Sequence, residues 1–180
     1  MPFMHAIPTH RLELTAATID HIFAEMESSE RLAQLLGTQV ESGWPPGDYD
    51  RDAQEFFACR LKEGGASVVG WYVWYAVQRE KENQTSILVG AGGYFGPPNE
   101  AGEVEMGFSI MPSVRGDGYA TEMTRALVSN AFRDIRVNKV IARTTSENIA
   151  SVKVLMKSGF SCVFRDQSGN DVFEILRNGG

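Results

Sequence analysis

The pattern of apolar and polar positions changes its period several times along the chain. Alternation over 10–16 predicts a first strand, and a helical period begins after Thr18 and ends near Gly37, enough for one or two helices. Asp50 suits the N-cap of a further helix over 51–64. The first third of the chain therefore predicts one strand followed by helices.

The middle of the chain turns to strands. Segments 70–80 and 86–96 are rich in β-branched and aromatic residues, and the polar stretch KENQT between them predicts a hairpin. Alternation in 102–112 predicts another strand. The apolar residues of 119–135 then recur at helical spacing, so a helix is expected to follow this strand.

The last third alternates between strand and helix. We expect a strand over 138–145, a helix over 147–159, and two closing strands over 160–166 and 171–178. This order predicts an α/β protein with one mixed sheet and helices packed on both of its faces. The length of 180 residues suits a single domain spanning 1–180.

Composition and charge narrow the choice of partners. Apolar residues make up 43% of the chain and charged residues 22%, as in ordinary globular proteins. The formal net charge of −6 and the lack of basic blocks argue against binding to nucleic acid. No stretch has the roughly 20 apolar residues of a membrane span, and the N-terminus does not have the pattern of a signal peptide. We therefore expect a cytoplasmic protein, monomer or homodimer, that does not bind membranes.

The cysteines and histidines do not indicate a disulfide framework or a metal site. Cys59 and Cys162 lie far apart without a partner motif, so we expect two buried thiols in a reducing compartment. His5, His10 and His21 have no cysteine or carboxylate cluster at metal-ligand spacing. The sequence predicts no metal.

The segment SVRGDGYATEM, residues 113–123, joins a predicted strand to a predicted helix. Gly116 and Gly118 have no Cβ, so the backbone there can take a positive φ and approach a ligand closely. The first N–H groups of the following helix lack partners within the helix, and the helix dipole is positive at that end. Arg115 adds a cation. These features are typical of an anion site.

Two better-known phosphate loops do not fit this segment. A Walker loop requires Gly-Lys-Ser/Thr, but Tyr119 follows Gly118. The dinucleotide fingerprint requires a third glycine, where this chain has Thr121. On its own, the segment is also compatible with a plain turn that needed two glycines.

A wider resemblance favours the phosphate interpretation. The stretch RGDGYA resembles the coenzyme A pyrophosphate loop, Arg/Gln-x-x-Gly-x-Gly/Ala, of the GNAT superfamily of acetyl-coenzyme-A-dependent N-acetyltransferases. The strand, loop and helix around it look like the central part of that family. The next helix carries a further signature at Asn148, Ser151, Lys157, Gly159 and Phe160. The resemblance implies a mostly antiparallel sheet that splays at the cofactor strand.

The resemblance also implies which groups hold acetyl-coenzyme A, the acetyl donor that leaves as coenzyme A. The pyrophosphate would be bound by backbone N–H groups of Arg115, Gly116, Asp117, Gly118, Tyr119 and Ala120, with Thr121 at the helix start. The pantetheine arm would lie along the main chain of Phe108, Ser109 and Ile110 as an added strand. Asn148 would hydrogen-bond the same arm, with Ser151 one helical turn further on. For Asn148 the alternative is an ordinary residue of the first helical turn.

Acetyl transfer to an amine requires a base for the nitrogen and an acid for the leaving thiolate. Strand alternation places Glu103, Glu105, Gly107 and Ser109 on one face, opposite a core-facing set. Glu105 lies near the centre of the cofactor strand, so it is the candidate base, either directly or through a water. The alternative is an exposed strand glutamate without a catalytic role.

The residue that would protonate the leaving thiolate is not the one that many members of the family use. Many GNAT enzymes carry a tyrosine seven residues after the asparagine, and this chain has Leu155 there. The Asn-x-x-Ser arrangement is similar to the ribosomal-protein N-terminal acetyltransferase branch, which makes Ser151 the candidate acid. The alternative is a hydroxyl that bonds only to cofactor or helix backbone.

The resemblance implies an enzyme that moves acetyl from acetyl-coenzyme A to a primary amine by direct attack in a ternary complex. The acceptor is either a protein or peptide N-terminus or a small-molecule amine, and the alternative is a non-catalytic acyl-coenzyme-A-binding or regulatory domain. Loop 41–50 and the 71–86 hairpin are expected to form the wall of the acceptor cleft. Alternation places Trp71, Val73 and Tyr75 on one side of the first hairpin strand and the intervening aromatic residues on the other.

Overall fold

The computed structural model describes residues 5–80 and 85–177. In these residues, eight strands form one sheet and are, in chain order, β1 (Ala6–Pro8), β2 (Leu12–Ala16), β3 (Val73–Gln78), β4 (Ile87–Tyr94), β5 (Glu103–Ile110), β6 (Lys139–Thr144), β7 (Ser161–Arg165) and β8 (Asp171–Leu176). The helices are α1 (Ile19–Glu27), α2 (Ser29–Leu36), α3 (Arg51–Gly64), α4 (Tyr119–Ala131) and α5 (Ile149–Lys157), with short 3₁₀ turns η1 (Gly65–Val68) and η2 (Pro112–Val114).

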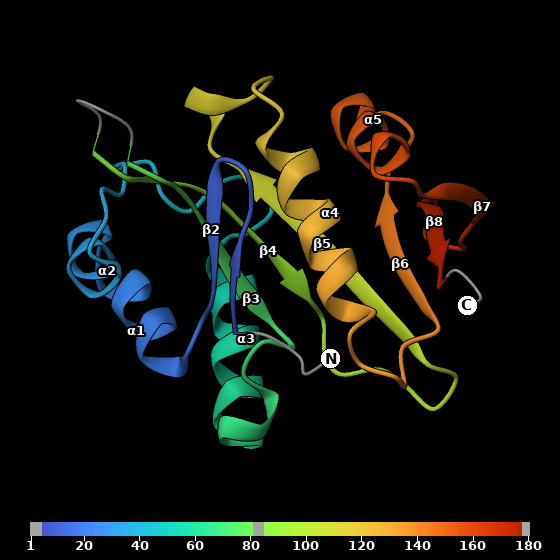
Figure 1. The fold of residues 1–180 in the computed structure, drawn as a ribbon, viewed down its shortest axis with the longest axis horizontal. Helices are drawn as coiled ribbons and strands as arrows, with labels where there is room; N and C mark the ends of the chain where they lie inside the picture. Colours follow the sequence, from blue (N-terminus) through green and yellow to red (C-terminus); the bar gives the residue numbers. More distant parts are fainter. Residues whose placement is uncertain (1–4, 81–84, 178–180) are drawn as a thin grey trace.

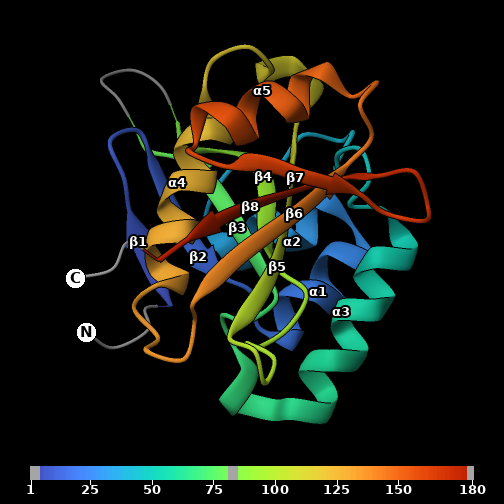
Figure 2. The ribbon, with the colours of Figure 1, turned by 90° about the vertical axis from the view of Figure 1, so that its right-hand side faces the viewer.

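The sheet order is β1-β2-β3-β4-β5-β6-β8-β7. Neighbouring strands run antiparallel except for β5 and β6, which are parallel. Helices α4 and α5 cover one face, and α1, α2 and α3 cover the other (Figures 1 and 2). The predicted mixed sheet with helices on both faces is confirmed.

Two separate apolar cores hold these layers together. Met123 and Leu127 of α4 and Leu155 of α5 are fully or almost fully buried in the core on one face. On the other face, Leu32 of α2 and Phe57 of α3 pack in a second core rich in aromatic rings. The sheet therefore separates two packed compartments, and a residue's position in the alternation of its strand decides which compartment it enters.

Local signals account for most helix boundaries. The Asp50 side chain accepts a hydrogen bond from the backbone N–H of Ala53 at 3.0 Å, as expected of an N-cap. Ser28 is in an extended conformation and its hydroxyl accepts from the Arg31 N–H at 3.1 Å. This serine ends α1 and caps α2, so the helical stretch after Thr18 is two helices.

Three expectations from the sequence are wrong in detail. Strand β1 was not predicted, because it is only three residues long and ends at a proline. β3 begins only at Val73, so the expected alternation fails for the two residues before it. Trp71 packs with Trp74 in the α4–α5 core, and Tyr72 packs in the other core with Val73 and Tyr75. Cys59 and Cys162 are exposed free thiols, because one faces outward on α3 and the other lies on the edge strand β7.

The parallel pair β5 and β6 separates part-way along its length. Paired residues run from Glu103 with Lys139 to Met106 with Ala142, although the two strands continue to Ile110 and Thr144. In Figure 1 the two strands diverge towards the top of the molecule. The splay expected at the cofactor strand is therefore present. The predicted KENQT connection between β3 and β4 occupies residues 81–85, of which only the last lies within the described residues.

Candidate active site

The loop between β5 and α4 has the backbone geometry of an anion cradle. Gly116 and Gly118 have φ values of 88° and 83°, in the left-handed region that glycine adopts without strain. Gly118 is the N-cap of α4, and no side chain caps the helix. A Cβ on Gly116 would meet nothing within 4 Å, so this side of the loop is open. The first-turn N–H groups are thus available to an anion.

Arg11, in the turn between β1 and β2, fixes this loop from the side. Its guanidinium donates to the Asp117 carbonyl at 2.7 Å, forms an ion pair with Glu122 at 2.7 Å, and lies 4.4 Å from the centre of the Tyr119 ring. Although burial by itself raises the pKa of Glu122, hydrogen bonds from Thr9 and Arg11 outweigh it and lower that pKa. The Glu122 carboxylate therefore stays ionised at neutral pH and keeps its ion pair with Arg11.

The main chain of β5 is open on the side of the splay. The Glu105 carbonyl accepts from the Phe95 N–H at 3.0 Å, and the Met111 N–H donates to Val89 at 2.9 Å. Because these groups alternate along an antiparallel pair, the main-chain groups of Ser109 also face β4, and those of Phe108 and Ile110 face the opening.

The Ile110 carbonyl already has a partner, because it accepts from Arg115 Nε at 3.3 Å. The Phe108 groups and the Ile110 N–H are therefore left for an added strand. Ser109 instead reaches the cleft through its side chain, which lies beside Gly47 of the 41–50 loop.

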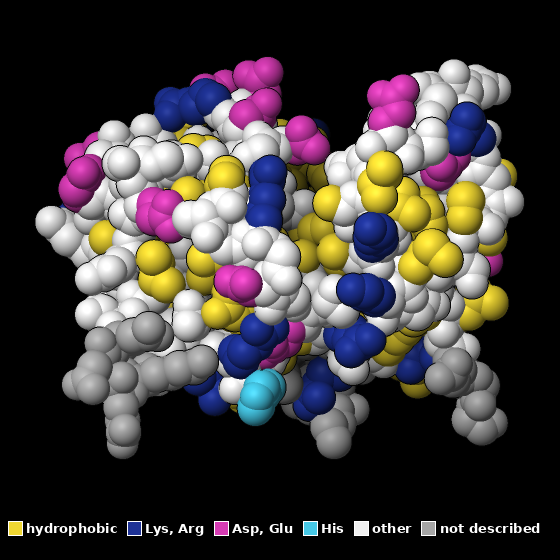
Figure 3. Space-filling model, turned by 90° about the horizontal axis from the view of Figure 1, so that it is seen from above, with side chains coloured by type: hydrophobic (Ala, Val, Ile, Leu, Met, Phe, Trp, Pro, Cys, Tyr) yellow, Lys and Arg dark blue, Asp and Glu magenta, His cyan; other side chains and the backbone are white. Residues whose placement is uncertain are grey.

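A cavity of about 220 Å³ joins the splay to the opposite face of the sheet. Its walls include the predicted residues Glu105, Phe108, Ser109, Asn148 and Ser151. Seen from above, the molecular surface is hollowed between the part that carries α5 and the rest of the molecule (Figure 3). The structure thus brings the candidate base and the candidate acid to one cavity.

The glycine loop borders a different, open depression. Gly118 and Thr121 line it together with His10, Arg11, Arg125 and Lys157. Lys and Arg side chains gather on the face seen in Figure 3. The predicted pyrophosphate loop and the predicted catalytic pair therefore occupy two adjoining sites.

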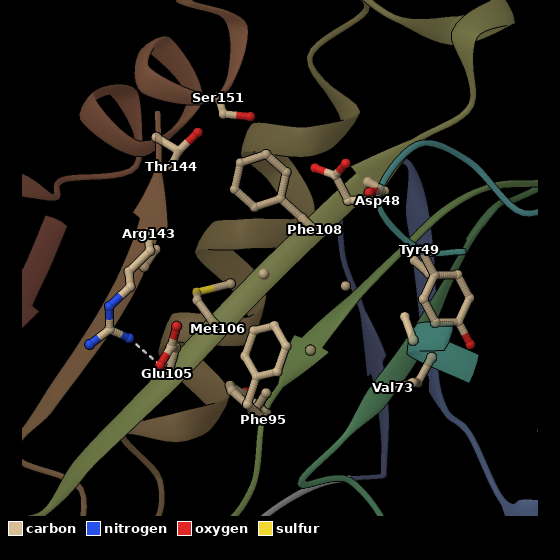
Figure 4. A pocket seen from close by; sticks show the side chains of 18 of the residues that line it. Asp48, Tyr49, Val73, Phe95, Glu105, Met106, Phe108, Arg143, Thr144 and Ser151 are labelled. Carbon is tan, nitrogen blue, oxygen red and sulfur yellow. Dashed lines mark hydrogen bonds and ion pairs between the residues drawn. The ribbon is translucent and has the colours of Figure 1, made fainter. Parts of the chain in front are cut away.

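Glu105 is not a free carboxylate. It forms an ion pair with Arg143 of β6, whose Nε is also 3.5 Å from an Asp166 oxygen (Figure 4). The hydrogen bond from Arg143 to Glu105 is the main cause of a raised Arg143 pKa. The guanidinium is therefore always charged, and it holds the Glu105 carboxylate at the wall of the cavity.

Asn148 and Ser151 occupy the start of α5. Asn148 is the N-cap, and its side-chain oxygen accepts from the Ser151 N–H at 3.1 Å. This use of the oxygen leaves the two amide protons of Asn148 for another partner. The hydroxyl groups of Ser151 and Thr144 both lie at the upper end of the cavity, near the Phe108 ring (Figure 4).

The acceptor-side wall comes from the 41–50 loop and the start of the 71–86 hairpin, as expected, together with β4 and with α3, which was not expected. Asp48 and Tyr49 line the cavity, and the ring of Tyr49 is buried. Behind it, the buried Glu25 of α1 accepts hydrogen bonds from the Tyr49 hydroxyl and from Trp44 Nε1, the latter at 2.8 Å. Burial raises the pKa of Glu25 to about 7, although these bonds act to lower it.

Comparison with known proteins decides the family. A family model described as "Acetyltransferase (GNAT) domain" matches residues 11–161, most of the chain. The chain belongs to the GNAT acetyltransferase family. It is 29% identical over 157 residues to the "Uncharacterized N-acetyltransferase YjdG" of Bacillus subtilis, covering 87% of this chain and 90% of that one. The family resemblance drawn from the sequence is confirmed, and the protein is an N-acetyltransferase of this family, whose members use acetyl-coenzyme A and act on amines.

Solved GNAT structures share the fold at low identity. The "putative ribosomal-protein-serine acetyltransferase" of Vibrio cholerae superposes with a TM-score of 0.63 at 17% identity, covering 98% of this chain and 100% of that one. An aminoglycoside acetyltransferase, AAC(6')-Ib, in complex with coenzyme A gives 0.59 at 17% identity, with 92% and 95% covered. Within the described residues, no helix has the length and apolar character needed to cross a membrane.

Sequence reasoning missed four residues of this GNAT site. Arg143 could have been found, because alternation in a parallel neighbour of β5 places it on the face of Glu105. The other three residues gave no comparable signal. Arg11 and Glu25 contact segments that are distant in the sequence, and Asp48 lies in a loop without periodicity.

Proposed function

We propose that this GNAT enzyme transfers acetyl from acetyl-coenzyme A directly to a primary amine while both substrates are bound. The observation that carries the proposal is the continuous cavity, which reaches from the open main chain at Phe108 to the Glu105 carboxylate. Two substrates that enter from opposite faces of the sheet meet there without an acyl-enzyme. Holding them in this geometry supplies a large part of the rate enhancement.

The residues present fit the donor. Two left-handed glycines and an uncapped helix start suit a pyrophosphate, and the basic depression with Arg125 and Lys157 suits further phosphate charge. The open main chain of Phe108 and the free amide protons of Asn148 suit the pantetheine amides. When bound, the donor supplies the thioester carbonyl that the amine attacks.

The proton path uses Glu105 and Ser151 in the proposed mechanism. The amine nitrogen forms a bond to the acetyl carbon as the carbon–sulfur bond breaks, and the sulfur leaves with the electron pair. An ammonium loses two protons on becoming an amide. Glu105 accepts one and passes it to solvent, and the other moves from the nitrogen through Ser151 or a water to the thiolate, so that Ser151 ends the reaction protonated. Arg143 orients the base without leaving its ion pair.

The ribosomal-protein N-terminal acetyltransferase branch is a proposal supported by the Asn-x-x-Ser arrangement at Asn148 and Ser151. The Vibrio cholerae structure adds the shared fold. Within this proposal the acceptor is either a protein or peptide N-terminus or a small amine. The single domain over 1–180, the cytoplasmic location and the monomer or homodimer state stay predictions.

The testing experiment measures thiol release from acetyl-coenzyme A with a panel of peptides, polyamines, amino acids and aminoglycosides. Turnover on at least one amine, abolished in a Glu105→Gln protein that still binds coenzyme A, supports the proposal. Tight binding of acetyl-coenzyme A without turnover on any amine would instead support the regulatory-domain alternative.

A further inference from the structure

The acceptor half of the cavity is built around one phenylalanine. Phe57 of α3 lies with its ring centre 6.2 Å from that of Tyr49, 6.0 Å from that of Tyr72 and 5.9 Å from that of Phe95. All four rings line the cavity. Phe95 is 50% exposed, an unusual state for so large an apolar ring, and Figure 4 shows it beside Glu105. This cluster of four rings is called the aromatic wall below.

Glycine keeps the floor beside the aromatic wall clear. Gly107 lies between Glu105 and Ser109 on the cleft face of β5. A Cβ there would stand 3.4 Å from the Phe95 ring, so any side chain would fill the space between that ring and the strand. The free space thus lies between a flat apolar surface and the candidate base.

The charge in the cavity suits one ammonium group and not several. Among the cavity-lining residues, the charged side chains are Asp48, Glu105 and Arg143, a net charge of −1. Glu105 is paired with Arg143, whereas within the described part of the chain Asp48 has no ion-pair partner. In Figure 4 the Asp48 carboxylate lies near the Phe108 ring and away from the pair of Arg143 and Glu105. A polycation would leave most of its charges uncompensated here, at a large desolvation cost.

We propose that the acceptor is an amine with a single ammonium group on a flat, aromatic body, held against the aromatic wall with its nitrogen directed to Glu105, in a cavity whose net negative charge includes Asp48. The proposal rests on the proposed acetyl transfer and adds the acceptor class to it. Aromatic rings prefer offset or edge contacts with other rings, and they attract an ammonium through their faces. Two sources share this chemistry: a free arylalkylamine, and a peptide whose first residue is aromatic.

The test compares kcat/KM by thiol release for five acceptors: phenethylamine, a peptide with N-terminal Phe, propylamine, spermidine and kanamycin. We expect at least one aromatic acceptor to exceed propylamine, spermidine and kanamycin by tenfold or more. The better of the two aromatic acceptors identifies the source. Equal rates for propylamine and the aromatic acceptors, or preference for a polycation, would overturn the acceptor class but leave acetyl transfer intact. Failure of every amine in a protein that binds coenzyme A would overturn both.

Two substitutions test whether the cavity residues produce the preference for an aromatic acceptor and the binding of the ammonium group. Phe95→Ala removes an exposed ring and should raise KM for the aromatic acceptor about tenfold, with the KM for propylamine unchanged. Phe23→Ala is the control, because Phe23 of α1 is also about half exposed and does not line the cavity. Asp48→Asn should raise KM for every amine, and Asp52→Asn on the exposed start of α3 should not. Unchanged kinetics in both cavity variants would overturn the proposal.

Discussion

The two sides of the cavity present different kinds of groups to a ligand, main-chain atoms on one side and side chains on the other. On the side where we propose that the cofactor binds, many of the proposed binding groups are main-chain atoms of β5 and of the glycine loop, arranged by strand, turn and helix within 103–131. On the acceptor side, they are side chains brought together from the 41–50 loop, α3 and the ends of β3 and β4, and Glu25 of α1 supports them from behind. A fold can therefore keep its binding site for one substrate, because that site is made of backbone atoms, while substitutions of side chains alone change which second substrate it accepts.

The largest effect should come from the residue at the boundary of the two sides. Glu105→Gln keeps the shape but accepts no proton, so kcat should fall by roughly 10²–10⁴. The deficit should shrink as pH rises, because more of the amine arrives already neutral. Glu103→Gln is the control, since Glu103 lies on the same face and is also ion-paired, with Lys139 at 2.5 Å, but does not line the cavity. Unchanged kcat in Glu105→Gln between about pH 6 and pH 9 would remove Glu105 as the base.

Glu25 belongs to the acceptor side alone, and it should make stability depend on pH. Its pKa is raised by burial from 4.5 to about 7, so the folded state binds a proton that the unfolded state has released in this window. The stabilising contribution is complete below about pH 4.5 and is lost as pH rises through 7. At about 1.4 kcal/mol per pKa unit, the loss is of the order of 3 kcal/mol.

Denaturant unfolding of wild-type protein and Glu25→Gln at several pH values tests this effect. The variant mimics the protonated acid, so its stability should lack the fall between about pH 5 and pH 8, while its affinity for coenzyme A stays at the wild-type value. Glu27→Gln, an exposed neighbour on α1, should behave as wild type. Parallel pH curves for wild type and Glu25→Gln would show that Glu25 does not titrate in this window.

Gly118→Val affects only the cofactor side. A side chain at φ 83° is strained, and its Cβ would stand 3.3 Å from the Arg11 guanidinium. We expect coenzyme A binding to weaken by about 2 kcal/mol, roughly 30-fold, because several charge-assisted bonds to the loop are lost. Gly169→Val is a closely matched control, since Gly169 has φ 85° in the turn between β7 and β8. It should cost similar stability and leave affinity unchanged by calorimetry; equal losses of affinity in both would contradict the cradle.

The smallest effect separates two roles of Asn148. Asn148→Ala should weaken coenzyme A binding by about 1–2 kcal/mol and also lower Tm, because both the cap and the amide donors are lost. Asn148→Asp keeps a capping oxygen for the Ser151 N–H but has no amide protons. It should therefore weaken binding with little change in Tm. Wild-type affinity in both variants would reduce Asn148 to a helix cap.

The same difference between backbone and side chains decided how far the sequence could be interpreted. The glycines, the helix start and the strand before it are adjacent in the chain, so local pattern predicted them, whereas the splay of the sheet was implied by the family resemblance. The glutamate on β5 followed from alternation, which is also local. The positions of Phe108, Ser109, Asn148 and Ser151 at one cavity are observed, but their roles in binding and catalysis stay predictions.

The positions that depend on contacts between distant segments could not be predicted in this way. Glu25 and Tyr49 come from elements whose relative placement depends on how α1 and α3 pack on the sheet. Arg11 donates a hydrogen bond to the glycine loop, which is more than a hundred residues away in the sequence. Trp71 left the expected alternation because the strand began later than its aromatic composition suggested. Long-range packing, not local propensity, fixes each of these positions.

The central claim is that both substrates occupy the cavity together and react without an acyl-enzyme. Initial rates with acetyl-coenzyme A and an active amine varied together test it most directly. The account predicts intersecting double-reciprocal lines and no acetyl group left on the protein in the absence of amine. Parallel lines with an acetylated protein detected by mass spectrometry would contradict it, since they are the signs of a covalent ping-pong route.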